Sequence, residues 1–150
     1  MSTPFDIQGN YNGNGINHEG QKFEAHFSLK SILDGKGCSL NFSAIGSNGE
    51  NFHTEHSLIG SDFQGNICLF VLSNNHTGMT PHILKNVEET PMGSKKFIFG
   101  FGNIQEINSF REEIVLEVLN DNKIDYRYFW GMPGGSFAER SGAIMNLISE

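Results

Sequence analysis

Turn-forming residues divide the C-terminal part of the chain into short segments. Asn120-Asp121-Asn122 and Pro133-Gly134-Gly135-Ser136 consist of residue types that tolerate turn conformations. They separate three segments with strand-like composition, Phe110 to Leu119, Lys123 to Met132 and Phe137 to Ile148. Strands joined by such short connections run antiparallel to their neighbours. The pattern therefore predicts consecutive antiparallel hairpins.

Two earlier segments alternate between apolar and polar residues, as strands with one buried face do. They are Lys22 to Ser31 and Cys38 to Ala44. The Asp34-Gly35 pair between them suits the positive backbone angles of a tight hairpin turn. We therefore expect these two strands to pair with each other.

Further strands are expected between the remaining turn signals: Gly9 to Asn17, Asn51 to Ile59, Asn66 to Ser73, Pro81 to Val87 and Lys96 to Phe101. The total is about nine or ten strands. A flat sheet of that size leaves two exposed edges and one uncovered face, and closure removes both problems. We predict an all-β chain with one domain over residues 1–150, a single up-and-down antiparallel β-barrel.

Two segments also have helical spacing, Ser28 to Leu33 and Arg140 to Ile148. A short helix is therefore an alternative at both. Gly142 and the turn before the second segment favour a strand there.

The charge and the termini limit the partners and the location. The formal net charge is −7, with only ten lysine and arginine residues and no basic cluster beyond Lys95-Lys96, so nucleic acid is not an expected partner. The segment Met1 to Asp6 lacks the features of a secretory signal, and no segment reaches membrane-spanning length. We expect a soluble cytoplasmic protein without membrane insertion. Its two cysteines, Cys38 and Cys68, are expected to be reduced thiols in the core.

The first predicted strand opens with Gly9-Asn10-Tyr11-Asn12-Gly13-Asn14-Gly15. This resembles the Gly-x-Trp-x-Gly-x-Gly opening of lipocalin-like barrels, especially nitrobindin-like proteins, with Tyr11 in place of tryptophan. These proteins belong to the calycin group, together with lipocalins and fatty-acid-binding proteins. Leu33-Asp34-Gly35 and Phe110-Arg111-Glu112 are similar in position to segments of small bacterial lipocalin-like domains of unassigned function. The resemblance implies a calycin-like barrel with an internal cavity.

The same resemblance bears on cofactors. In nitrobindin-like proteins a histidine late in the chain ligates haem iron, and this sequence has no histidine after His82. The haem site is therefore not carried over, and we expect no cofactor.

An aromatic row in one strand is the main candidate for a binding surface. Tyr126, Tyr128 and Trp130 share one face of a predicted strand. If that face points inward, the interior is lined by rings with polar tips, which is typical of small-molecule pockets. The alternative is that these residues fill a solid core.

Glu112 shares its predicted face with Phe110, so its carboxylate needs a partner in apolar surroundings. Arg140 is a candidate, because a guanidinium can hold a carboxylate with two hydrogen bonds. We favour an architectural pair at the barrel rim. The alternative is that Arg140 or Arg127 binds the acid group of a ligand, with Arg127 less suited because alternation turns it towards solvent.

The histidines offer further candidates. His53 and His56 are separated by an odd spacing in a strand and lie on opposite faces, so we expect no chelating pair and no metal site. His56 is grouped with Phe52 on the face that we expect to point inward, where it could act as acid, base or polar anchor. His76 and His82 are expected in or beside a solvated loop that covers a barrel mouth.

We therefore expect non-catalytic binding of a small lipophilic or aromatic molecule, one that can carry a carboxylate. The expected ligand-binding residues are Tyr126, Tyr128, Trp130, His56, Glu112 and Arg140. No nucleophile elbow, Walker loop, Rossmann fingerprint or His-Glu-x-x-His motif is present. The alternatives are a small isomerase, cyclase or hydrolase that uses His56 and Glu112 as acid and base, and a haem-binding barrel that uses His56, His76 or His82. An exposed edge or a phenylalanine-rich outer face could support a homodimer.

Overall fold

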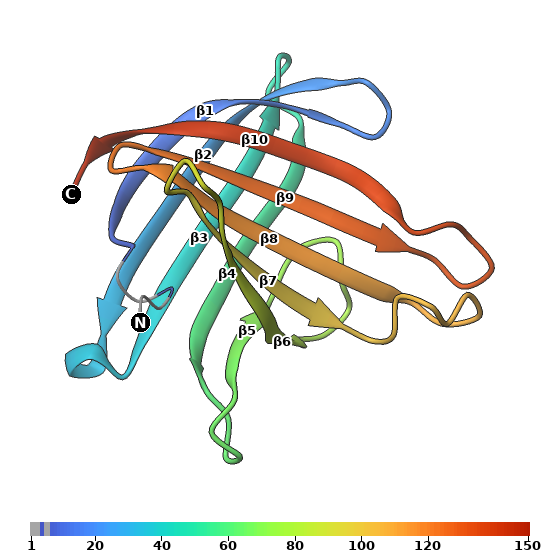
Figure 1. Ribbon diagram of the computed structural model, residues 1–150. Helices are drawn as coiled ribbons and strands as arrows, with labels where there is room; N and C mark the ends of the chain where they lie inside the picture. The colour runs from blue at the N-terminus through green and yellow to red at the C-terminus, as the bar shows by residue number, and fades with distance from the viewer. Residues whose placement is uncertain (1–3, 5–6) are drawn as a thin grey trace.

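The computed structural model describes residue 4 and residues 7–150, which contain ten antiparallel strands closed into a barrel. The strands are β1 (Gly9–Asn17), β2 (Lys22–Ile32), β3 (Gly37–Gly46), β4 (Asn51–Ser61), β5 (Ile67–Val71), β6 (Thr80–Glu89), β7 (Lys95–Phe101), β8 (Arg111–Asn120), β9 (Lys123–Gly131) and β10 (Ala138–Ser149). Each strand pairs with the next along the chain, and β10 pairs with β1 to close the barrel (Figure 1). The predicted all-β, up-and-down barrel is confirmed.

Strand structure prevails in both segments that had helical spacing. β2 continues to Ile32, and only the one-turn 3-10 helix η2 (Leu33–Gly35) follows it. Asp34 and Gly35 have φ angles of 55° and 84°, so the turn uses the positive backbone angles that the Asp-Gly pair predicts. β10 hydrogen-bonds to β9 on one side and to β1 on the other, and a helix could not satisfy both ladders.

Glycines in β1 allow the barrel to close. A Cβ atom at Gly13 would lie against the Ile144 carbonyl oxygen and 2.9 Å from the Cα atom of Met145, both in the backbone of β10. A Cβ atom at Gly15 would meet the Gly142 carbonyl oxygen and the Phe23 ring. The glycines that opened the first predicted strand therefore mark the seam where the first and last strands meet.

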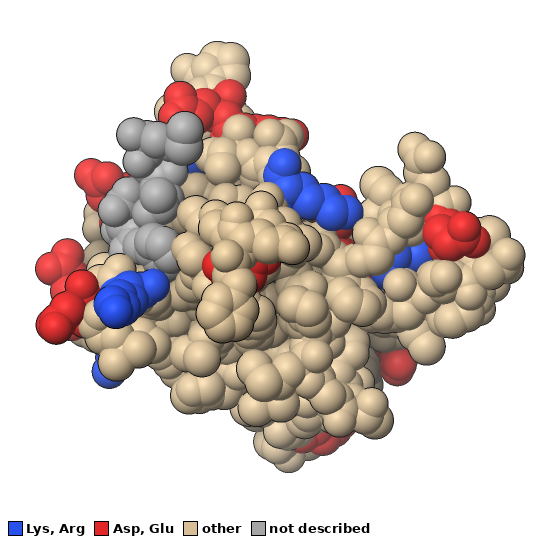
Figure 2. Space-filling model, turned by 90° about the horizontal axis from the view of Figure 1, so that it is seen from below, with Lys and Arg blue, Asp and Glu red and all other residues tan. Residues whose placement is uncertain are grey.

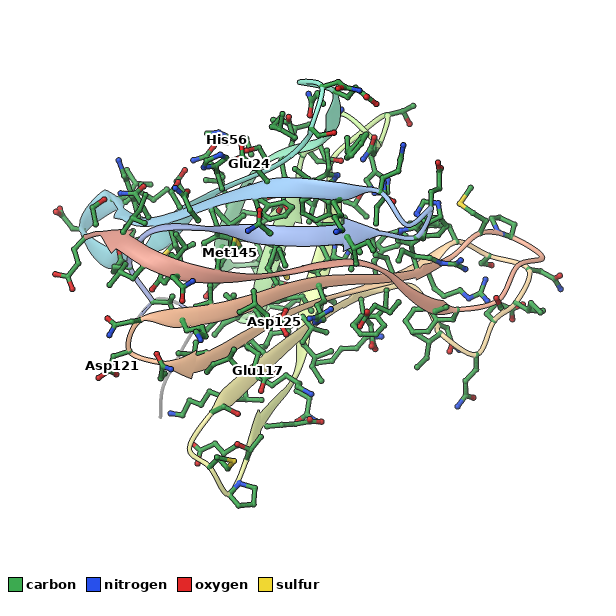
Figure 3. The ribbon with its side chains drawn as sticks, turned by 90° about the horizontal axis from the view of Figure 1, so that it is seen from above. Glu24, His56, Glu117, Asp121, Asp125 and Met145 are labelled. Atoms are coloured by element: carbon green, nitrogen blue, oxygen red, sulfur yellow. The ribbon has the colours of Figure 1, made fainter. Side chains whose placement is uncertain are left out.

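Apolar side chains fill one half of the barrel interior. This is the end at which β1 begins and β10 ends, and fully buried Met145 lies there (Figure 3). Aromatic edge contacts join the middle of the core, with the ring of Tyr126 5.1 Å from that of Phe27 and 5.0 Å from that of Phe42. Other fully buried members of this core are Phe97, Phe99, Leu29, Leu40, Ile59, Leu116 and Ile124. This half of the barrel is solid.

The outer surface carries scattered charge. On the face shown in Figure 2, lysine and arginine side chains are separated by uncharged surface. Cys38 and Cys68 are both buried and are not joined in a disulfide. Cys38 belongs to the apolar core, whereas the thiol of Cys68 lies 3.8 Å from Oδ2 of Asp62. Within residue 4 and residues 7–150, no helix has the length and apolar character needed to cross a membrane.

Candidate functional site

The other half of the barrel is hollow. Its end, which we call the mouth, is formed by the loops β1–β2, β3–β4, β5–β6, β7–β8 and β9–β10. The mouth opens into a cavity of about 400 Å³. Its aromatic wall consists of Phe23, Phe42, Phe52, Phe110 and Trp130. Its main polar groups are His53, His76, Glu112, Tyr128 and Arg140.

The interior is solid in one half and hollow in the other, and the aromatic row of β9 extends from the solid half into the hollow half. Tyr126, Tyr128 and Trp130 all point inward. Tyr126 lies within the apolar core, whereas Tyr128 and Trp130 line the cavity. The predicted inward face of this strand therefore supplies both the floor and one wall of the cavity.

Glu55, on β4, is a buried carboxylate directly below the cavity, and three hydroxyl groups hydrogen-bond to it. The Tyr126 hydroxyl donates to its two oxygens at 3.0 and 3.2 Å, and the Ser57 hydroxyl donates at 2.5 Å. The Tyr128 hydroxyl also donates to Oε1 of Glu55. A carboxylate in an apolar interior is stabilised by such donors, because they replace the water that it loses.

Tyr126 and Tyr128 remain donors over the physiological pH range. Burial raises the pKa of each phenol well above its ordinary value, and the negative charge of Glu55 raises it further. The two hydroxyl protons therefore stay in place to hydrogen-bond to the carboxylate.

His53 joins this network to the cavity wall. Its Nε2 lies 3.0 Å from the Tyr128 hydroxyl oxygen, and its Nδ1 lies 2.7 Å from Nδ2 of Asn75. Since Asn75 Nδ2 can only donate, Nδ1 of His53 accepts and its Nε2–H donates to Tyr128. The tyrosine in turn donates to Glu55, so one directed chain of hydrogen bonds runs from the β5–β6 loop to the buried carboxylate.

A second carboxylate, Glu112 on β8, lies between two histidines. His82, on β6, is fully buried, and its Nε2 lies 2.8 Å from Oε1 of Glu112. The other ring nitrogen of His82 lies 3.1 Å from the Thr80 carbonyl oxygen. His76, in the β5–β6 loop, places its Nε2 3.7 Å from the same Glu112 oxygen.

The histidine contacts of Glu112 favour its ionised form. Burial would raise the pKa of Glu112, but the contacts and charges of His76 and His82 outweigh burial and lower that pKa below its ordinary value. Both ring nitrogens of His82 face acceptors, the Thr80 carbonyl oxygen and the ionised Glu112 carboxylate. The nearby Glu112 carboxylate also raises the pKa of His76, against the opposing effect of burial.

The expected pair of Glu112 with Arg140 is wrong. Arg140 is the extra residue of a β-bulge between β10 and β9, where the alternation of faces is interrupted. Its guanidinium donates to the carbonyl oxygens of Trp130 and Ser136 at 3.0 and 2.6 Å and lies 4.5 Å from the Trp130 ring centroid. Arg140 therefore lines the cavity at its rim, above Trp130.

The expected inward orientation of His56 is also wrong. His56 is exposed on the outer face of the barrel, as Glu24 is (Figure 3). The Gly46 amide donates to the Glu50 carbonyl oxygen across the β3–β4 turn. Two residues before Gly46, Ala44 is paired with His53, which lies three residues after Glu50. β4 therefore contains one extra residue here, Phe52. A bulge of one residue exchanges the two faces of the strand, which turns His53 inward. The prediction that His53 and His56 lie on opposite faces is confirmed.

Local sequence patterns did not indicate the roles of His76 and His82. Both were expected in or beside a solvated loop, but His82 lies on β6, within the predicted strand Pro81 to Val87, and its inward-facing side chain is fully buried. His76 has a side chain that is 22% exposed and lines the cavity. Arg127 lies on the outer face as expected, where it pairs with Asp125 and Glu139.

The residues do not form a clear metal or haem site. Within the described part of the chain, no group of three or more histidine, cysteine or acidic residues is arranged to hold a metal ion. Of the histidines considered for haem, His56 lies outside the barrel, and both ring nitrogens of His82 are hydrogen-bonded. His76 lines the cavity but is directed at Glu112. We therefore do not propose haem as the ligand.

Comparison with solved structures supports the architecture. The chain is similar to the crystal structure of Rv2717c from M. tuberculosis, with a TM-score of 0.75 and 8% sequence identity over 99% of both chains. It is also similar to a de novo designed fluorescence-activating β-barrel, with a TM-score of 0.50 and 10% identity over 99% of this chain and 100% of the other. At these identities the likeness shows a shared fold. No protein-family model matches the chain, and no curated protein matches it.

Proposed function

We propose that the barrel binds a small, largely apolar molecule with an aromatic part in the mouth cavity. The observation that carries the proposal is an open-mouthed cavity of about 400 Å³ walled by aromatic rings, with a few polar groups held in fixed positions. This combination is typical of small-molecule sites. Binding requires no reaction, and the polar groups then serve to orient the ligand.

One cation at the cavity rim, Arg140, favours a ligand with an acid group. Two acidic residues, Glu19 and Glu112, also line the cavity, and Glu112 accepts a hydrogen bond from the buried His82. Arg140 adds a cation at the rim, and its Nη1 makes no hydrogen bond to any residue that the structure describes. A planar aromatic carboxylate or sulfonate could pack against the aromatic wall and reach this guanidinium.

We also infer that the chain is a calycin-like barrel. A closed up-and-down barrel with one internal cavity is the architecture of that group. The glycine-rich first strand, which forms the seam with β10, supports the assignment.

Trp130 provides a direct test because it is the only tryptophan of the chain and lines the cavity. We expect 1-anilinonaphthalene-8-sulfonate, an anionic aromatic dye, to bind with saturation, to gain emission and to quench Trp130. Ala44→Phe, which fills the cavity, should abolish these changes. Phe63→Ala, in the fully exposed β4–β5 turn, is the matched control and should leave them unchanged.

The acid group is tested separately. Arg140→Gln should weaken sulfonate binding by about tenfold, which is the effect of about 1.4 kcal/mol lost from one charge-assisted contact. The affinity for a neutral dye such as Nile red should change by less than twofold. The absence of saturable binding by both dyes would overturn the proposed function.

Other expectations from the sequence remain predictions. These are the absence of nucleic acid among the partners, a cytoplasmic location and the ability to form a homodimer. The alternative of an enzyme that uses His56 and Glu112 as acid and base is not proposed, because His56 lies outside the barrel.

A further inference from the structure

His76 has the surroundings of a base rather than of a passive wall residue. Its ring lies edge-on to Phe110, with 5.5 Å between the ring centroids, and its Nε2 lies 3.7 Å from Oε1 of Glu112. The structure gives its Nδ1 no hydrogen-bond partner among the described residues. A neutral His76 with its proton on Nε2, facing the carboxylate, therefore keeps a lone pair on Nδ1.

Glu112 is itself fixed in position. Its Oε1 accepts a hydrogen bond from the buried His82, and the other nitrogen of His82 is held by the Thr80 carbonyl group. A carboxylate that is anchored on one side can orient an imidazole on the other and stabilise the imidazolium that forms when this imidazole takes a proton. His82 is fully buried behind Glu112, and Glu112 and His76 both line the cavity.

We propose that His76 acts as a general base towards a small aromatic or conjugated substrate in the mouth cavity, with Glu112 and His82 as positioning residues. The proposal rests on the proposed function, because the substrate occupies the same cavity. His76 takes a proton from an acidic C–H group, and the electron pair of that bond enters the conjugated system. Return of the proton to another atom of the system gives an isomerisation, which needs no oxidant or reductant.

Several charged or titratable groups surround His76. Glu112 on β8 and His82 on β6 belong to the same cluster, and Glu55 on β4 adds to the negative charge nearby. His53, Tyr128 and Arg140 line the same cavity. The proximity of Glu112 raises the pKa of His76 from its ordinary value of 6.5, against the effect of burial. The basic form of His76 therefore grows as the pH rises through that raised pKa.

The ring opening of 5-nitrobenzisoxazole tests the base without knowledge of the natural substrate. A base removes the ring C–H proton, the electron pair of that bond forms the C≡N triple bond, and the N–O bond breaks with its pair on the oxygen. The product is the yellow 2-cyano-4-nitrophenolate, and the base then releases its proton to water. This substrate is small, aromatic and apolar, as the cavity wall requires.

We expect saturable turnover whose rate rises with pH to a plateau. His76→Gln should lower kcat by about 100-fold or more, because a positioned base typically contributes at least that factor. His76 is a partly exposed loop residue, so this variant should fold normally. His56→Gln, on the outer surface, is the matched control and should leave the rate unchanged. A rate in His76→Gln equal to that of the unchanged protein would overturn the proposal.

The positioning role of Glu112 is tested by the pH dependence of the rate. Glu112→Gln should move the inflection of the pH–rate profile to lower pH, because it removes the charge that raises the pKa of His76. It should lower kcat and leave KM nearly unchanged. An unshifted inflection, in a variant with native Trp130 emission, would overturn the role of Glu112.

Trp130 quenching separates the two proposals. Saturable quenching by 5-nitrobenzisoxazole without turnover would overturn the general base and support the binding function. The absence of both quenching and turnover, together with failure of both dyes to bind, would overturn both.

Discussion

Glu55→Ala tests the polar layer below the cavity most directly. The substitution removes the acceptor of three buried hydroxyl groups, those of Tyr126, Tyr128 and Ser57. A buried donor left without an acceptor costs about 1–3 kcal/mol. Water from the adjacent cavity can enter the vacated space and hydrogen-bond to some of the three hydroxyl groups. The total cost should therefore be lower than the sum of three unsatisfied donors. We expect the free energy of unfolding to decrease by about 3–5 kcal/mol.

The loss can be measured by urea unfolding at pH 7, followed by the emission of Trp130, with a thermal scan as a second probe. For a chain of this size, about 3–5 kcal/mol corresponds to a decrease in Tm of about 6–20 °C. Glu24→Ala replaces an exposed glutamate on β2 and is the control, with an expected change within about 0.5 kcal/mol.

The reasoning also predicts a rescue. When the partners of a buried hydrogen bond are all replaced by apolar groups, the cost can be nearly zero. Glu55→Leu combined with Tyr126→Phe and Tyr128→Phe should therefore recover at least half of the loss in Glu55→Ala. A loss below about 1 kcal/mol in Glu55→Ala would refute the view that this carboxylate organises the layer.

Three further predictions concern pH, the mouth loops and barrel closure. The pKa of His76 is raised and that of Glu112 is lowered, so their contact stabilises most between the ordinary values of 4.5 and 6.5. The stability gap between the unchanged protein and His76→Gln in urea unfolding should therefore be larger at pH 5.5 than at pH 8.5, because the contact weakens as the pH rises through the raised pKa of His76. Arg111→Met removes the donors to the Met132 and Gly135 carbonyl groups at 2.9 and 2.6 Å, so amide exchange over residues 132–136 should accelerate, whereas an unchanged rate would contradict this role. Gly13→Ala should reduce Tm sharply because its Cβ meets the backbone of β10, and Gly78→Ala, which meets nothing within 4 Å, should not.

The sequence predicted the fold well because the turns and the alternation of side chains are local signals. The hairpin residues limit the direction of each strand, and the number of strands makes closure favourable. Alternation also placed Tyr126, Tyr128 and Glu112 on inward faces, as observed, because β8 and β9 keep a regular register over these residues.

The candidate site was predicted less well because it depends on irregularities. Phe52 and Arg140 are extra residues in β-bulges, and each shifts the face of the strand that carries it. Because of the bulge at Phe52, His53 faces the interior in place of His56. Because of the bulge at Arg140, this arginine lies at the rim and not beside Glu112. Neither bulge has a strong sequence signal, since no glycine occupies the extra position in either case.

The partners of the two buried carboxylates could not be found by local analysis either. Glu55 on β4 is bonded to Tyr126 and Tyr128 on β9, across the barrel interior, and Glu112 on β8 is bonded to His82 on β6. In both cases the partners lie on strands that are not adjacent in the sheet. Such pairs appear only when the barrel has closed, so strand alternation cannot reveal them.

The same contacts explain why the interior is solid in one half and hollow in the other. A collapse of the mouth would place apolar rings against the cavity floor, where His53 hydrogen-bonds to the Tyr128 hydroxyl and that hydroxyl donates to Glu55. Arg111 and Arg140 each hold backbone carbonyl groups of the β9–β10 connection, so this part of the mouth is fixed as well. Buried polar groups need defined partners, whereas an apolar core can rearrange to fill space. The polar layer therefore marks the depth at which the core ends and the ligand space begins.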